Sequence, residues 1–77
     1  MSWSKEFSDY VDGKANEVAR AWREYDKDGL ASVLYDVEED TGYNAGFLYE
    51  VLSENEADYP IEVAAEHTIT VAYERDY

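Results

Sequence analysis

Apolar residues recur at helical spacing from the N-terminus to about Ser53, and this periodicity restricts the fold more than any other feature of the chain. In the first segment they fall three or four residues apart, or at sums of such steps, at Trp3, Phe7, Val11, Val18, Trp22 and Tyr25. At about 100° per residue these side chains share one side of a helix, and most charged residues of the segment fall on the other side. The pattern predicts one long amphipathic helix from roughly Ser4 to Tyr25.

A second amphipathic helix is predicted from about Gly29 to Asp40. Its apolar residues occupy the positions that one buried helix face requires, and these are Leu30, Val33, Leu34 and Val37. The preceding turn signal, Asp-Lys-Asp-Gly, offers Asp28 as the N-terminal cap. Gly42 is suited to end the helix, because glycine readily adopts the left-handed backbone of a helix C-terminus.

A third helix is predicted to begin after Asn44 and to end near Ser53. Its expected buried stripe consists of Phe47, Leu48, Val51 and Leu52. The residues from Asn55 to Pro60 are mostly acidic and end in a proline, which indicates a loop.

The C-terminal segment shows a period of two instead. From Ile61 the odd positions carry Ile, Val, Ala, His, Ile, Val and Tyr, whereas the even positions carry Glu, Ala, Glu, Thr, Thr, Ala and Glu. This alternation predicts a strand from about Thr68 to Glu74. Residues 61–67 fit either a strand or the start of a short helix after Pro60. If they form a strand, a link at Ala64–Glu66 makes a hairpin, although the link lacks the glycine or asparagine that tight hairpins favour.

Together these elements define an α+β fold that is mainly helical, with three amphipathic helices and a β-prone C-terminal segment that forms a strand or a hairpin. Seventy-seven residues make a single small acidic domain, residues 1–77. Because a lone strand cannot pair its own backbone groups, the pattern also allows a homodimer through the C-terminal strand.

The composition excludes most catalytic and metal chemistry. With no cysteine and one histidine, the chain has neither a thiol nucleophile nor the ligands of a Cys/His zinc site. That histidine, His67, lies among the alternating residues and is interpreted as structural. The Asp-Lys-Asp-Gly turn is similar to the start of a calcium loop, but Val37 stands where the ligating glutamate belongs. We therefore expect no enzyme, no catalytic residue, no cofactor and no dedicated metal site.

The N-terminus lacks the apolar core and the cleavage site of a signal peptide. No apolar run is long enough to cross a membrane, so a cytoplasmic protein is expected. The acidic composition also disfavours direct binding to anionic lipids or to nucleic acid.

Negative charge is concentrated in the middle of the chain. The formal net charge is −13, yet residues 1–25 are almost balanced, with four basic and five acidic residues. From Asp26 to Asp58, ten acidic residues face Lys27 alone. Such density destabilises the compact state by repulsion, which predicts a compensating basic partner. Because most basic protein surfaces hold nucleic acid, the expected partner is a basic nucleic-acid-binding protein or complex.

Carboxylates and tyrosines are interleaved in this acidic region. Side chains four residues apart on a helix lie about 6 Å from each other, close to the spacing of successive phosphates on a nucleic-acid strand. Such acids can occupy a cationic channel meant for phosphates, and neighbouring tyrosines add contact area and cation–π contacts. The candidate charged residues are Asp36, Glu38, Glu39, Asp40, Glu50, Glu54, Glu56 and Asp58. The candidate anchors are Tyr35, Tyr43 and Tyr49.

In size and composition the chain resembles the small acidic DNA-mimic inhibitors, the anti-restriction and anti-CRISPR proteins that phages and mobile elements use against host DNA-binding systems. The resemblance covers overall character and no sequence motif. It implies a non-enzymatic inhibitor in the cytoplasm of a prokaryotic host, which binds a nucleic-acid-binding protein and blocks its phosphate-binding surface. Two alternatives stay open: an acidic domain adapted to high salt, and a general protein-interaction or antitoxin-like module. A solvated acidic surface that only maintains solubility explains the same composition.

Overall fold

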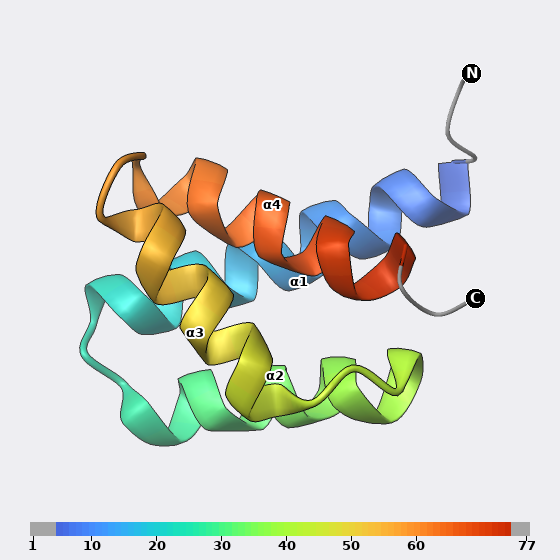
Figure 1. The fold of residues 1–77 in the computed structure, drawn as a ribbon, viewed down its shortest axis with the longest axis horizontal. Helices are drawn as coiled ribbons and strands as arrows, with labels where there is room; N and C mark the ends of the chain where they lie inside the picture. Colours follow the sequence, from blue (N-terminus) through green and yellow to red (C-terminus); the bar gives the residue numbers. More distant parts are fainter. Residues whose placement is uncertain (1–4, 75–77) are drawn as a thin grey trace.

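Four α-helices form the regular structure of residues 5–74, which are the residues that the computed structural model describes. They are α1 (Lys5–Arg23), α2 (Lys27–Thr41), α3 (Ala45–Glu56) and α4 (Ile61–Glu74). In Figure 1, α4 lies across the front of α1, α2 runs along the opposite side of the molecule, and α3 crosses obliquely between them. Helix α4 contacts each of the other three helices, so the C-terminal segment completes the core.

Helices α1 and α4 lie antiparallel, and side-chain contacts hold both ends of the pair (Figure 1). Arg23, at the end of α1, forms an ion pair with Glu62 at the start of α4. At the opposite end, the rings of Phe7 and Tyr73 meet edge to face, with centroids 4.8 Å apart. Tyr10 also contacts Tyr73, with a centroid separation of 5.6 Å. Because such aromatic pairs stabilise beyond the area they bury, this end of the pair is firmly fixed.

Helix α2 returns alongside α1 in the opposite direction. The Tyr10 hydroxyl, near the start of α1, donates a hydrogen bond of 2.8 Å to the Asp40 carboxylate near the end of α2. The buried face of α2 is the one that the sequence spacing predicts, with Val33, Leu34 and Val37 in the core. This part of the sequence-based prediction is confirmed.

The core is formed by the buried faces of all four helices. Its largest completely buried aliphatic side chains are Val18, Val37, Leu48, Leu52 and Ile69. Burying a branched aliphatic side chain stabilises a fold by about 1.5–3 kcal/mol, so these residues provide much of the driving force. Helix α4 adds three buried small residues that let the neighbouring helices approach closely, namely Ala64, Ala65 and Ala72.

The predicted C-terminal strand is wrong: residues 61–74 form helix α4, and no strand occurs between Lys5 and Glu74. The buried side chains follow helical spacing, at Ala64, Ala65, Thr68, Ile69 and Ala72. In the alternating pattern Val63 and His67 fall on the same parity as Ile69, but Val63 is 49% exposed and His67 is exposed, whereas Ile69 is buried. The α+β class is therefore corrected to an all-helical fold for the described residues.

The alternation was misleading because the buried face of α4 carries small and weakly apolar residues. Thr68 is fully buried, yet its hydroxyl donates a hydrogen bond of 2.8 Å to the Ala64 carbonyl one turn earlier, so burial leaves no unpaired polar group. Of the two alternatives for residues 61–67, the helix start after Pro60 is the one that the structure has, and the link of the alternative hairpin, Ala64–Glu66, lies inside the helix. Because these residues are helical, neither a homodimer nor an interaction module can pair through the predicted C-terminal strand.

Capping residues set the boundaries of α2. Asp26, rather than the predicted Asp28, caps the helix, and its carboxylate accepts a hydrogen bond of 2.9 Å from the Gly29 N–H. The helix therefore begins earlier than predicted, and Asp28 lies in its first turn. Gly42 ends the helix as predicted, with a φ of 80° and an N–H that donates to the Glu38 carbonyl.

Helix α3 begins after Asn44, as predicted, because the Asn44 side chain accepts hydrogen bonds from the first-turn N–H groups of Gly46 and Phe47, at 2.8 and 3.2 Å. It continues to Glu56 instead of ending near Ser53. Phe47, expected in the buried stripe, is 59% exposed, since α3 buries only a narrow stripe of Ala45, Leu48 and Leu52.

The predicted face of α1 is largely confirmed, with Phe7, Val11 and Val18 buried and Trp22 half-buried. The exception is Tyr25, which is 90% exposed because α1 ends at Arg23 and the backbone turns at Tyr25, where φ is 56°. Trp3, assigned to the same stripe, lies outside the described residues.

Candidate binding groove and acidic surface

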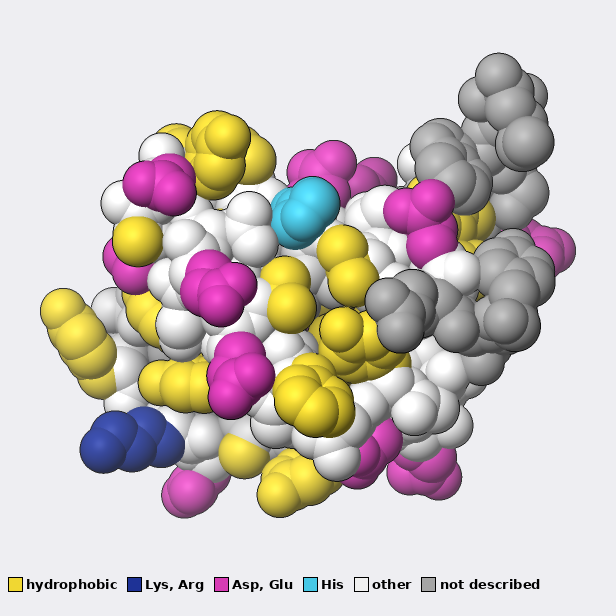
Figure 2. Space-filling model, viewed as in Figure 1, with side chains coloured by type: hydrophobic (Ala, Val, Ile, Leu, Met, Phe, Trp, Pro, Cys, Tyr) yellow, Lys and Arg dark blue, Asp and Glu magenta, His cyan; other side chains and the backbone are white. Residues whose placement is uncertain are grey.

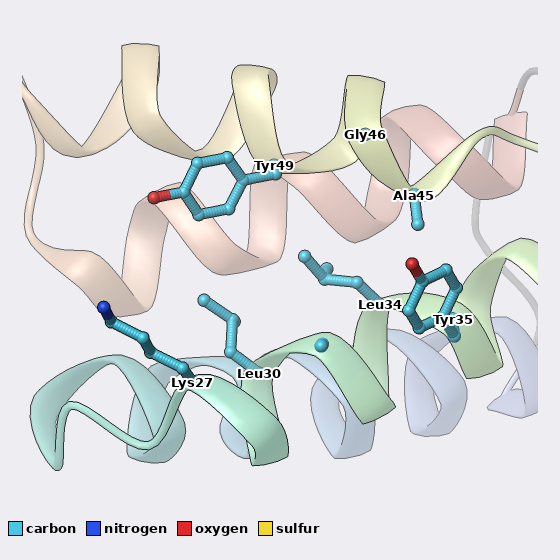
Figure 3. Close-up of a pocket in the computed structure, with 8 residues that line it drawn as sticks. Lys27, Leu30, Leu34, Tyr35, Ala45, Gly46 and Tyr49 are labelled. Atoms are coloured by element: carbon cyan, nitrogen blue, oxygen red, sulfur yellow. The ribbon is translucent and has the colours of Figure 1, made fainter.

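A groove of about 520 Å³ runs between α2 and α3 (Figure 3). From α2 it is lined by Lys27, Leu30, Ala31, Leu34 and Tyr35. From α3 it is lined by Ala45, Gly46 and Tyr49. Its lining is therefore mostly apolar, with two phenols and one ammonium group as the polar side chains.

Small residues keep this groove open. Ala31, Ala45 and Gly46 present little or no side chain at positions where larger residues would fill the space between the helices. A second hollow of about 210 Å³, lined partly by Trp22 and Tyr25, shares lining residues with the groove and extends it toward the turn between α1 and α2. The result is a continuous depression over three elements.

Two of the three predicted tyrosine anchors meet at this groove. Tyr35 is 61% exposed and Tyr49 is 49% exposed, and both line the depression from opposite helices. The Tyr49 ring also packs beside Trp22, with centroids 6.3 Å apart. In Figure 3 the Tyr49 hydroxyl points toward the end of the groove that Lys27 occupies, whereas the Tyr35 hydroxyl points toward Ala45.

The third anchor, Tyr43, lies elsewhere. It is half-buried in the connection between α2 and α3, and its N–H donates to the Thr41 hydroxyl at 3.2 Å. A separate shallow hollow there is lined by Tyr43 and the exposed Phe47. The structure therefore divides the predicted aromatic set between two places.

Two of the eight predicted acidic residues have roles within the fold. The Glu38 carboxylate accepts a hydrogen bond of 3.1 Å from the Ala45 N–H, at the first residue of α3. A carboxylate at this point pairs an otherwise unpaired N–H and interacts favourably with the positive end of the helix dipole. Asp40 accepts the hydrogen bond from Tyr10 described above. Glu38 therefore connects α2 to the start of α3, and Asp40 connects α2 to α1.

The other six acids are distributed over α2, α3 and the loop that follows α3. Asp36 lines a hollow between α1 and α2 that Arg20 also lines, while Glu39 is exposed elsewhere on α2. On α3, Glu50 and Glu54 are exposed and four residues apart. The remaining two are the half-buried Glu56, at the end of α3, and the exposed Asp58 in the following loop. In Figure 2 the acidic side chains of the visible face stand singly among hydrophobic and uncharged ones.

The basic residues are more strongly localised than the acidic ones. Between Lys5 and Glu74 all of them lie on α1 except Lys27, at the first position of α2. Figure 2 shows basic side chains only at the corner where α2 begins. The surfaces of α2, α3 and α4 therefore combine many carboxylates with a single ammonium group.

The hydrogen bond between Tyr10 and Asp40 lies where three helices meet, because Tyr10 also contacts Tyr73 of α4. Burial of the phenol, together with the hydrogen bond to and the negative charge of Asp40, raises the pKa of Tyr10 above its usual range. The neutral phenol is the donor in this bond, so the contact is made at all physiological pH values.

Sequence reasoning missed the groove and its lining residues Lys27, Leu30 and Ala31. The available signal was the small size of Ala31 and Gly46 beside otherwise apolar helix faces. That signal has no meaning until α2 and α3 are placed next to each other.

Within residues 5–74, no three His, Asp or Glu side chains gather as a metal site requires. None of the helices in this range combines the length and the apolar character needed to cross a bilayer. No protein-family model, curated protein sequence or solved structure matches the chain. The functional argument therefore depends on the geometry and charge of its own residues.

Proposed function

We propose that this chain is a non-enzymatic inhibitor that binds a basic nucleic-acid-binding protein and blocks its phosphate-binding surface. The observation that carries the proposal is the separation of charge in space. Four of the five basic residues between Lys5 and Glu74 lie on α1, so the faces of α2, α3 and α4 present carboxylates with Lys27 as their only base. A surface of this sign attracts cationic surfaces over distances up to about 10 Å at ordinary ionic strength.

Exposed carboxylates imitate phosphates in the contacts that they make with arginine. A guanidinium group donates two parallel hydrogen bonds to either anion, so residues that bind a nucleic-acid backbone also bind Asp and Glu. Glu50 and Glu54, one helical turn apart on α3, and Glu39 on α2 are exposed and make no ion pair or side-chain hydrogen bond with another described residue. These three residues, with Asp36 and Asp58, are the revised set for partner contact. Glu38 and Asp40 are reassigned to holding the fold.

The test compares two triple charge reversals. One changes Glu39, Glu50 and Glu54 to lysine, and its matched control changes Asp9, Asp12 and Glu24 to lysine. Both variants change the net charge equally, all six positions are exposed, and melting curves establish that each variant is folded. The immobilised chain is incubated with a prokaryotic lysate at low salt, and the main protein eluted by salt is purified and identified. Its binding to nucleic acid is then measured with increasing amounts of each variant.

The unmodified chain should displace nucleic acid from the captured protein, and displacement should weaken steeply as salt is raised. Reversal of Glu39, Glu50 and Glu54 should weaken displacement by at least about tenfold, whereas the control reversal should change it by less than about twofold. Equal effects of the two variants, or a captured protein that does not bind nucleic acid, would refute the proposal.

Acidic side chains occur at several places on the face shown in Figure 2, which also favours a second candidate, adaptation to high salt with an unrelated function. An acidic surface of that kind is stable only when concentrated salt screens its repulsion. Thermal melts between about 0.1 and about 2 M KCl distinguish the two: a high-salt domain unfolds in dilute buffer, whereas an inhibitor of ordinary cells is folded there.

A further inference from the structure

The groove between α2 and α3 is an exposed, mostly apolar depression. Its floor is formed by Leu30, Ala31 and Leu34, and its two sides by Tyr35 and Tyr49 (Figure 3). Large exposed apolar surfaces with a polar border mark places where another molecule binds. The question is which molecule has the matching chemistry.

The border of the groove is acidic. Three exposed carboxylates lie within one helical turn of a lining residue: Asp28 is three residues before Ala31, Glu39 is four after Tyr35, and Glu50 is four after Gly46. No ion pair or side-chain hydrogen bond engages these three carboxylates within residues 5–74. Lys27 lies at one end only, so the mouth of the groove has an excess of negative charge. A complementary occupant therefore has apolar side chains at its centre and positively charged side chains beside them.

The backbone hydrogen bonds that a bound segment needs indicate its secondary structure. Between Lys5 and Glu74 the chain offers no strand edge for a bound segment to pair with, so a segment that satisfies its own backbone hydrogen bonds is favoured in the apolar groove. A helix does so, and a depression between two helices is a common site for the apolar face of a third. A second copy of this chain is a poor occupant, since each copy carries a net charge of −13 and would repel the other.

We propose that the groove receives an amphipathic helix of the basic partner, whose apolar side chains enter between Tyr35 and Tyr49 and whose flanking arginines or lysines meet Asp28, Glu39 and Glu50. This inference rests on the proposed function and deepens it, because it names the element of the partner that is gripped. Apolar contact in the groove provides specificity that charge alone does not provide.

The experiment titrates the isotope-labelled chain with three synthetic helical peptides and follows its backbone amide signals by NMR. The first peptide has leucines along one face and arginines beside them. In the second peptide the leucines are replaced by alanine, and in the third the arginines are replaced by glutamine. At near-physiological salt the first peptide should bind at least about tenfold more tightly than either control, because both chemistries are needed. Its signal changes should centre on Lys27, Ala31, Tyr35, Gly46 and Tyr49.

Two substitutions in the groove of this chain test the same contact, and each has a control at an exposed position outside the groove. Ala31→Trp fills the groove from an exposed position and should weaken binding of the first peptide by at least about tenfold, while Asn16→Trp, exposed on α1, should leave binding unchanged. Tyr35→Ser removes one side of the groove without disturbing the core, and Tyr59→Ser, similarly exposed in the loop before α4, is its control. Melting curves establish that each variant is folded.

Equal binding of the leucine-free peptide, signal changes centred on α1 and α4, or self-association of the free chain through the same residues would overturn the inference. If Ala31→Trp abolishes peptide binding but still displaces nucleic acid from the captured protein, the groove inference fails and the proposed function stands. If reversal of the acids leaves displacement unchanged, the proposed function fails, whatever the peptides show.

Discussion

The two halves of this molecule use their aromatic residues differently. In the α1–α4 pair, Phe7 and Tyr10 both contact the ring of Tyr73, and the phenol of Tyr10 donates a hydrogen bond to Asp40 of α2. In the α2–α3 pair, Tyr35 and Tyr49 are largely exposed on the sides of an open groove. The first half therefore uses its aromatic surface for stability. The second half leaves it exposed, beside eight carboxylates of α2 and α3, as the proposed partner-binding surface requires.

The largest effect should come from the core that α4 completes. Ile69→Ala removes a fully buried side chain and should lower the free energy of unfolding by about 3 kcal/mol, because it leaves a cavity in a packed region. Val63→Ala, on the same helix but 49% exposed, should change it by less than about 0.5 kcal/mol. Urea unfolding measures both. Similar losses for the two would contradict the helical arrangement of α4, in which Ile69 is buried and Val63 is largely exposed.

The next largest effect on the free energy of unfolding is expected at Glu38, and it should be absent at the neighbouring Glu39. Glu38→Ala removes the acceptor of the Ala45 N–H and should cost about 1 kcal/mol, as loss of a helix cap does. Glu39→Ala should be nearly neutral or slightly stabilising, because it removes one exposed negative charge from an acidic surface. Chemical denaturation of the two variants in the same buffer compares them. Equal costs would mean that the contact between Glu38 and α3 adds nothing to stability.

A loss of stability of similar size is expected when the hydrogen bond between Tyr10 of α1 and Asp40 of α2 is removed. Tyr10→Phe keeps the ring contact with Tyr73 but removes the hydrogen bond to Asp40, and should cost about 1 kcal/mol near neutral pH. The pKa of Tyr10 is raised in the folded state, so its contribution is full below about pH 10, the pKa of an unfolded tyrosine, and decreases as pH rises through the folded value. The unmodified chain should therefore lose more stability than Tyr10→Phe as pH is raised above about 10. Melts across that range check this, and parallel curves would contradict it.

The smallest effect concerns the exposed aromatics. Tyr35→Ala should change the free energy of unfolding by less than about 0.5 kcal/mol, because the ring is 61% exposed and contributes little to the core. Tyr73→Ala, in the other half, should cost several times more, since it removes the ring contacts with Phe7 and Tyr10. A large loss for Tyr35→Ala would show that the groove half is stabilised by its own aromatics, and the contrast between the halves would disappear.

Much of the fold was predictable because its signals are local. The buried faces of α1 and α2, the stop at Gly42 and the start after Asn44 all depend on residues that lie within a few positions of one another. The errors also have a local cause. Asp26 and Asp28 are both good capping residues, and only the hydrogen bond to Gly29 selects the first.

The candidate site was less predictable from sequence. The tyrosines Tyr35 and Tyr49 were identified, and the structure brings them to one groove, but Lys27, Leu30 and Ala31 were not. Composition treats Glu38, Glu39 and Asp40 as equivalent charges. Whether a carboxylate is exposed or accepts a hydrogen bond from another helix depends on how those helices pack, and their sequence spacing does not contain that information.

By itself, the sequence determined three amphipathic helices, most of their buried faces and a strongly acidic chain, because periodicity, capping and charge act between near neighbours. Only the tertiary structure decided that residues 61–74 are helical, since Ala64, Thr68 and Ala72 become core residues when three other helices close over them. It also decided which acids support the fold and which face solvent. The physical reason is the same in both cases: burial and hydrogen bonding between helices depend on distances that are set only when the whole chain has packed.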